Sequence, residues 1–298
     1  MAGGTRHALY SAASFSFFSE RTFTRTVAGL AANSRSTLVN GSMPRRFFLA
    51  GITWDVTFSK RVADESGLNV VLATGVYTYD HLPQILLNRS EDQVAEIFVH
   101  DIENGIQGTD IKAAFIKCAA DQGGVTPNVE KIHRAAARAS QQTGRPIMAH
   151  SNPGSGTGLE QMRVFADEGL DPANVQVAHT GDTDDLDYIE RLLDTGVWIG
   201  MDRFGLPIFL PDEQRIPTVL ELLERGYAER MFLSADSCAT IDWYPFEVAE
   251  QLIANGLVQD WNIKKVPEKV IPELREKGMT EEQLETMMVS NAQTWLGR

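Results

Sequence analysis

The sequence predicts an α/β fold, a (β/α)8 TIM barrel whose first one or two strands are degenerate or missing. From Asn69 onward, short apolar runs alternate with segments of helical periodicity. Near-continuous apolar runs of about five residues between helices are typical of buried parallel strands. The chain has 298 residues, which is enough for one barrel of about 250 residues. Several of the apolar runs also end on residues that can hold a metal ion.

Six parallel strands account for the apolar runs. We expect them at residues 69–74, 113–117, 146–150, 175–179, 197–202 and 231–236. A barrel closes without an open edge only when it has eight strands. Two further strands should therefore lie in residues 1–68, where we find no complete strand.

Helices are predicted between these strands, at residues 90–105, 126–144, 158–168, 184–195 and 215–225. Thr126 and Pro127 supply an N-cap and a first-turn proline, and Gly144 ends the same helix. The remainder of the chain is predicted to be helical. Its last helix begins at Thr280, with Gln283 three residues later, the pattern of a capping box.

Residues 1–58 form an anomalous N-terminal segment, followed by a barrel domain at residues 59–298. Residues 1–54 contain six Arg, no Lys and a single acid, Glu20. Three explanations stay open. The segment is a targeting peptide, because Arg- and Ser-rich, acid-poor leaders direct import, or it is a disordered extension. The third, which we favour, is translation in a shifted reading frame combined with a deletion.

The overall composition excludes several classes of protein. The formal net charge of −13 argues against a nucleic-acid-binding surface. No apolar run approaches the roughly 20 residues that span a bilayer, so we expect no membrane insertion. Cys118 and Cys238 are expected to be reduced packing residues rather than a disulfide, as is usual in a cytoplasmic protein.

Four strand ends carry Lys117, His150, His179 and Asp236. In a (β/α)8 barrel these ends converge on the active site, and neutral imidazole is a good zinc ligand. A buried lysine would repel cations unless carbon dioxide converted it to a carbamate, whose two oxygens can bridge two metals. Alone, either histidine would more often be a hydrogen-bonded core residue. Together, the four residues indicate a metal-dependent hydrolase.

The sequence around these strand ends resembles the phosphotriesterase family, and within it the phosphotriesterase-like lactonase branch of the amidohydrolase superfamily. The resemblance covers roughly residues 60–298. It rests on the segments Gly75–Tyr79, Phe115–Lys117, Ala149–Asn152, His179–Asp185, Met201–Arg203 and Asp236–Trp243.

The resemblance implies two divalent metal ions, zinc above all, bridged by a carboxylated lysine and a hydroxide. Lys117 would be the bridging lysine, His150 and His179 would bind one metal, and Asp236 would bind the other. Asp236 would also take the proton of the attacking hydroxide and deliver it to the leaving group.

The resemblance also implies residues that bind the substrate. Tyr77 would orient a lactone, and Arg203 and Trp243 would line the substrate pocket. Ordinary aromatic packing stays open for Tyr77 and Trp243, and a surface ion pair stays open for Arg203. The expected partner is a small-molecule substrate, and a homodimer is expected because relatives often form one.

The sequence departs from the family at the first strand. Members carry a His-x-His pair there, and this chain has no such pair. An alignment on Phe18–Glu20 places Ala12 and Ser14 at the two positions. Three functions therefore stay open: a hydrolase of lactones, including acyl-homoserine lactones, with weaker activity on organophosphate triesters; an amidohydrolase of other specificity; or a catalytically impaired relative.

Overall fold

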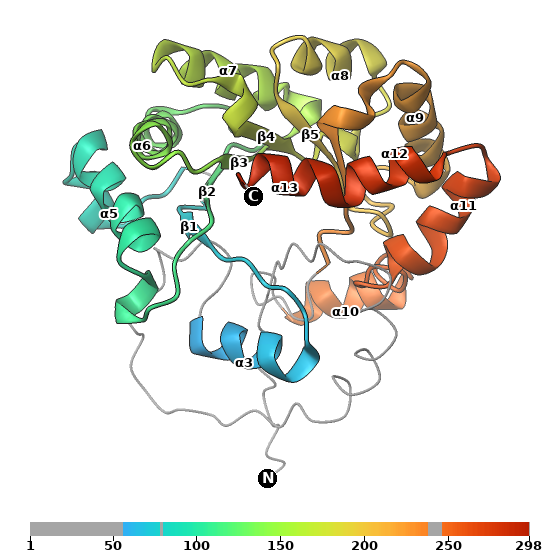
Figure 1. Cartoon of the computed structure of the whole chain (residues 1–298), viewed down its shortest axis with the longest axis horizontal. Coiled ribbons are helices and arrows are strands. Elements are labelled where there is room, and N and C mark those ends of the chain that lie inside the picture. The colour runs from blue at the N-terminus through green and yellow to red at the C-terminus, as the bar shows by residue number, and fades with distance from the viewer. Residues whose placement is uncertain (1–55, 78–79, 238–245, 298) are drawn as a thin grey trace.

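A parallel six-stranded sheet forms the centre of the computed structural model, which describes residues 56–77, 80–237 and 246–297 (Figure 1). The strands lie side by side in chain order. They are β1 (Ala73–Gly75), β2 (Phe115–Ala119), β3 (Ile147–His150), β4 (Val175–Ala178), β5 (Trp198–Met201) and β6 (Met231–Leu233). Sequential parallel order with a helix after each strand is the pattern of a (β/α)8 barrel. The predicted fold class is thereby confirmed, and each predicted strand is present.

Helices cover the outer face of this sheet (Figure 1). They are α5 (Glu91–Glu103), α6 (Pro127–Thr143), α7 (Thr157–Asp167), α8 (Leu186–Leu193) and α9 (Asp212–Glu224). Thr126 caps α6 by accepting a hydrogen bond from the Val129 N–H, and Gly144 ends it in the left-handed conformation. Both were predicted. The prediction placed the start of α9 at residue 215, whereas the helix begins at Asp212, directly after the extended Pro211.

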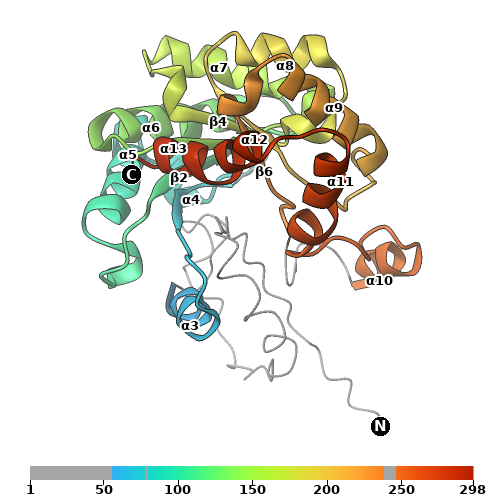
Figure 2. The ribbon, with the colours of Figure 1, turned by 45° about the vertical axis from the view of Figure 1, so that its right-hand side comes forward.

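Two helices lie apart from this layer. The helices α3 (Val56–Ser66) and α10 (Phe246–Ala254) lie on the side of the molecule opposite α7 and α8 in both views (Figure 2). The sequence did not predict α3. The predicted anomalous segment lies outside the described residues except for residues 56–58, which begin this helix.

The C-terminal part is helical, as predicted. It contains α11 (Ile271–Glu276), α12 (Glu281–Glu285) and α13 (Asn291–Trp295). A further short helix, α4 (Gln84–Leu87), lies between β1 and α5. Thr280 and Gln283 form the predicted capping box at the start of α12. Within the described residues, no helix is both long and apolar enough to cross a membrane.

The strands divide their side chains between two apolar clusters. Ile116 and Ile147 belong to the cluster that packs under the helices. Phe115 and Met148 belong to a second cluster, together with Trp295 of α13. Because successive strand residues point to opposite faces, the second cluster fills the interior of the barrel, and the residues two positions after its members also point inward.

Candidate metal and proton-transfer site

Strand alternation places Lys117 and His150 inside the barrel at the end where strands finish. Each lies two residues after a side chain of the inner cluster, Lys117 after Phe115 and His150 after Met148. Residues two apart on a strand share a face, so both point inward. Lys117 is 3% and His150 is 2% exposed. The two most buried candidates of the sequence analysis are therefore brought together by ordinary strand geometry.

Gly75 allows β1 to approach Lys117 closely. The φ of Gly75 is +124°, and a Cβ added to it would lie 2.0 Å from the carbonyl oxygen of Lys117. The Val76 N–H donates to the same oxygen at 3.0 Å. Only glycine adopts such a backbone without penalty. The loop that carries Tyr77 is thereby fixed directly above Lys117.

Asp202 orients His179, which follows β4. One carboxylate oxygen accepts the His179 N–H at 2.9 Å, and the other contacts Nδ1 of the ring at 2.8 Å. His179 has a φ of 66°, in the left-handed region that non-glycine residues rarely occupy. Since a carboxylate only accepts hydrogen bonds, Nδ1 carries the proton and the lone pair lies on Nε2. Asp202 thus selects the tautomer that a metal ligand needs.

The His150 ring, at the end of β3, lies between the Tyr77 hydroxyl and the Asp121 carboxylate. Its Nδ1 is 3.0 Å from the Tyr77 hydroxyl, and its Nε2 is 3.2 Å from Oδ2 of Asp121. The centroids of the His150 and His179 rings are 4.5 Å apart, with the rings edge to face. The two histidines therefore form one site.

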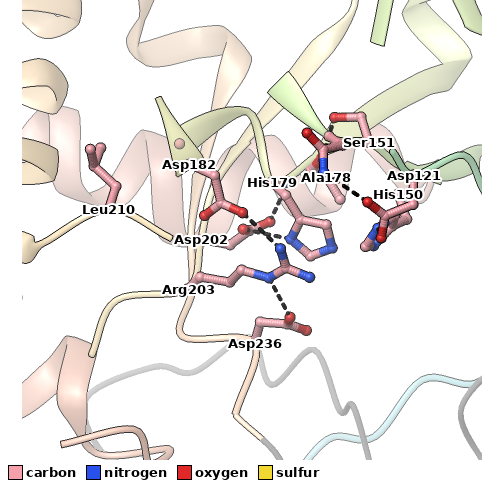
Figure 3. Close-up of polar contacts among 12 residues, drawn as sticks. Asp121, His150, Ser151, Ala178, His179, Asp182, Asp202, Arg203, Leu210 and Asp236 are labelled. Carbon is pink, nitrogen blue, oxygen red and sulfur yellow. Dashed lines mark hydrogen bonds and ion pairs between the residues drawn. The ribbon is translucent and has the colours of Figure 1, made fainter. Parts of the chain in front are cut away.

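Arg203 joins two carboxylates on the other side of His179 (Figure 3). Its Nε is 3.1 Å from Oδ2 of Asp236, and its Nη1 donates to Oδ2 of Asp182 at 2.7 Å. Both Arg203 and Asp236 have positive φ, 63° and 48°. Left-handed backbone at non-glycine residues costs of order 1–3 kcal/mol each and is concentrated at functional sites. The structure thus places Arg203 beside Asp236 in an ion pair that is largely buried.

The buried Arg215 holds Asp182 and the backbone next to Arg203 in place. It is 1% exposed, and its guanidinium donates to Oδ1 of Asp182 at 2.7 Å and to the backbone carbonyl of Asp202 at 2.8 Å. It also donates to the Gly181 carbonyl. Arg215 therefore connects the loop after β4 to the end of β5, and holds Asp182 in place for Arg203.

Burial shifts the bases of the site toward their neutral forms. It lowers the pKa of Lys117 to about 8, although Asp236 and Asp202 act in the opposite direction. It also lowers the pKa of His150 and takes that of His179 well below its ordinary value, with the Arg203 charge adding to both effects. Neutral imidazoles can bind a metal, and a neutral amine can react with carbon dioxide.

The donor chemistry of these residues fits a divalent metal such as zinc. Within the described part of the chain, no three His, Cys, Asp or Glu side chains form a metal cluster by themselves. Lys117 would have to supply a ligand, which an ammonium cannot do and a carbamate can. With Lys117 in that form, His150, His179 and Asp236 would complete a nitrogen and oxygen ligand set.

Four residues of the site were not predicted from the sequence, and one predicted residue lies outside the described part of the chain. Asp121, Asp182, Asp202 and Arg215 were given no role, although Asp202 is the last residue of a predicted strand and Asp121 and Asp182 follow predicted strands by a few residues. Their position near strand ends was the sequence feature that could have indicated a role in the site. Trp243, predicted to line the substrate pocket, lies outside the described residues.

Comparisons with known proteins agree with this architecture. Residues 45–296 match the model of the phosphotriesterase family. An aryldialkylphosphatase from Saccharolobus solfataricus is 44% identical over 241 residues, which are 81% of this chain and 76% of that protein. The solved phosphotriesterase from Mycobacterium tuberculosis superposes with a TM-score of 0.76 at 39% identity, covering 82% of this chain and 76% of the other.

A second solved structure extends the comparison. The phosphotriesterase homology protein from Escherichia coli, complexed with phosphate in its active site, superposes with a TM-score of 0.70 at 33% identity. The match covers 81% of this chain and 79% of that one. The chain belongs to the phosphotriesterase family of hydrolases.

Proposed function

We propose that this protein is a metal-dependent lactonase that also hydrolyses organophosphate triesters more slowly. The observation that carries the proposal is the convergence of Lys117, His150 and His179, all buried, beside a carboxylate that is held by an arginine. Supporting it, the similar Saccharolobus protein is an aryldialkylphosphatase. A lactone carbonyl and a phosphotriester both present an electrophilic centre to an attacking water.

Lys117 as its carbamate, His150, His179 and Asp236 would hold the metal, which would polarise the substrate oxygen and lower the pKa of the attacking water. Two such ions are expected from the family. The expectation that carbon dioxide modifies Lys117 is supported by burial, which lowers the pKa of this amine to about 8.

Asp236 is the proton carrier in this proposal. Its carboxylate accepts the proton of the attacking water and returns it to the leaving alcohol, which is general acid–base work. Arg203 orients the carboxylate through Nε and is itself held by Asp182. Tyr77, whose hydroxyl already lies at hydrogen-bond distance from His150, orients the ring oxygen of the lactone. Trp243 contributes to the substrate pocket.

A catalytically impaired relative is the second candidate function. It is favoured by one observation, the absence of a His-x-His pair from all 298 residues. An amidohydrolase of other specificity is the remaining alternative. The protein is expected to act in the cytoplasm on a small molecule, as a homodimer.

Substrate and metal assays on the purified chain test the proposal. The rates for an acyl-homoserine lactone, an aryl dialkyl phosphate and an N-acyl amino acid are compared after dialysis against zinc and bicarbonate. Lactone hydrolysis that is fastest of the three and abolished by Asp236→Asn supports the proposal. Faster amide hydrolysis would favour the alternative specificity, and no turnover of any of the three compounds would overturn the proposal and favour an impaired relative.

A further inference from the structure

Four hydrogen-bonding groups hold His150. Its carbonyl accepts the Ala120 N–H at 3.0 Å and Nε2 of Gln161 at 2.7 Å, so its backbone is fixed to β2 and α7. The ring contacts the Tyr77 hydroxyl through Nδ1, at 3.0 Å, and Asp121 through Nε2, at 3.2 Å; the Tyr77 hydroxyl also lies 3.5 Å from Nε2.

Asp121 is itself oriented by its neighbours. Its Oδ1 accepts the Gln122 N–H at 2.8 Å and Nδ2 of Asn152 at 2.8 Å. With two donors on Oδ1, the other oxygen, Oδ2, is the one directed at His150 (Figure 3). Asn152 is fixed in turn, because its Oδ1 accepts the Ser155 N–H at 3.1 Å. The carboxylate therefore has one orientation.

We propose that Asp121 is a positioning residue that fixes the tautomer and orientation of the His150 ring, with the proton on Nε2 and the lone pair of Nδ1 directed into the site. A carboxylate accepts and cannot donate, so Nε2 must be the donor, whereas the Tyr77 hydroxyl can donate to Nδ1. The inference rests on the proposed function, because the Nδ1 lone pair, which accepts the Tyr77 hydroxyl in this structure, would instead bind the metal.

A carboxylate then orients each of the two histidine rings, but it pairs with a different ring nitrogen in each. Asp202 accepts a hydrogen bond from the Nδ1 proton of His179, so the lone pair of that ring lies on Nε2. Asp121 accepts a hydrogen bond from the Nε2 proton of His150, so the lone pair of that ring lies on Nδ1. Carboxylates that orient metal-binding imidazoles in this way typically change metal affinity 10- to 100-fold when they are removed.

The variant Asp121→Asn isolates the tautomer effect. Since Oδ1 is held by two donors, the amide oxygen would take that position and the NH2 group would face His150. Nε2 would then have to accept a hydrogen bond, and the proton would move to Nδ1. The shape of the side chain is almost unchanged, so the fold should be preserved.

The first measurement is the 15N NMR spectrum of histidine rings in metal-free protein, with the resonances of His150 assigned by their loss in His150→Gln. The wild type should show a protonated Nε2, and Asp121→Asn should show a protonated Nδ1. An unchanged tautomer in the variant overturns the proposal. The control is Asp194→Asn, which alters an exposed carboxylate at the end of α8 and should leave the spectrum of His150 unchanged.

The second measurement is zinc affinity, by competition with a chromogenic chelator. We expect Asp121→Asn to weaken binding 10- to 100-fold and Asp194→Asn to leave it unchanged. Equal zinc affinity in wild type and Asp121→Asn overturns the positioning role. If the wild type itself binds no zinc, the proposed function fails, while the NMR result still decides whether Asp121 sets the tautomer.

Discussion

Arg203 places its Nε 3.1 Å from Oδ2 of Asp236, and its guanidinium also reaches Asp182. The side chain of Arg203 is 12% exposed and that of Asp236 is 27% exposed. The carboxylate proposed to carry the proton is therefore oriented by a nearly buried cation that is anchored at its other end.

Replacing Arg203 should impair catalysis and also destabilise the folded protein. We expect Arg203→Met to lower kcat/KM for lactones roughly 100-fold, the lower range of a general acid–base contribution. Removing one partner of a buried charge network should also destabilise the protein by about 3 kcal/mol. Arg203→Lys keeps the charge but not the forked geometry, so its kcat/KM should lie between that of the wild type and that of Arg203→Met.

Steady-state kinetics and chemical denaturation measure these effects. Arg225→Lys is the matched control, because Arg225 pairs with Glu190 and Glu221 at the surface. Activity of Arg203→Met close to that of the wild type would contradict the role given to this residue.

Lys117→Met should abolish metal binding and yet not destabilise the metal-free protein. Burial already lowers the pKa of Lys117 to about 8, which shows that the site disfavours the ammonium. An apolar side chain of similar length avoids that penalty. Elemental analysis after dialysis and thermal melts with and without chelator measure the two effects. A variant that kept the metal content of the wild type would exclude Lys117 as a ligand.

Gly75→Ala should be among the most damaging single-methyl additions. Its Cβ would overlap the Lys117 carbonyl oxygen, and its φ of +124° is unfavourable for alanine. We expect a loss of more than about 3 kcal/mol of stability, measured by denaturant unfolding. Gly123→Ala is the control, since a Cβ there meets nothing within 4 Å. Equal effects of the two substitutions would refute the packing argument.

The buried His133 should make stability depend on pH. Burial lowers the pKa of His133 to about 4, from an ordinary value of 6.5. Between these values the unfolded chain binds more protons, so stability rises with pH. The contribution is complete above pH 6.5 and is lost as the pH falls toward 4, by up to roughly 3 kcal/mol.

Removing this imidazole should reduce the pH dependence. In the structure its Nδ1 contacts the Val129 carbonyl, and its Nε2 lies 3.1 Å from Nε2 of Gln161. His133→Leu should therefore flatten the profile of unfolding free energy between pH 4 and 6.5, measured on metal-free protein. His150 and His179 act in the same direction and remain in the variant. An unaltered profile would show that His133 is not the group that titrates.

Local sequence could predict the strand-end donors but not what holds them. Lys117 and His150 each follow an apolar run, and alternation along a strand decides which way they point. Arg215 lies at the predicted start of a helix, where an arginine is usually exposed. Only the folded chain places it under Asp182, far back in the sequence. Contacts of this kind depend on which loops meet in space.

Other parts of the prediction were limited for different physical reasons. The helix α3 contains many charged and hydroxyl side chains, and it lies within residues 1–68, where strands rather than a helix were expected. His179, Arg203 and Asp236 adopt left-handed backbone, which is uncommon for any residue except glycine, even though His and Asp adopt it more often than most. The proposed roles of Trp243 and of the N-terminal segment stay predictions.

The Trp295 ring of α13 contacts Phe115 of β2 at 5.6 Å and Phe232 of β6 at 6.0 Å between ring centroids. These partners lie near opposite ends of the sheet order, and Trp295 comes late in the chain. On the ribosome, most of the strands would emerge well before the residue that closes the inner cluster. Domains generally fold as units during synthesis, so a nascent chain of this protein would keep part of that interior open to chaperones until translation had passed α13.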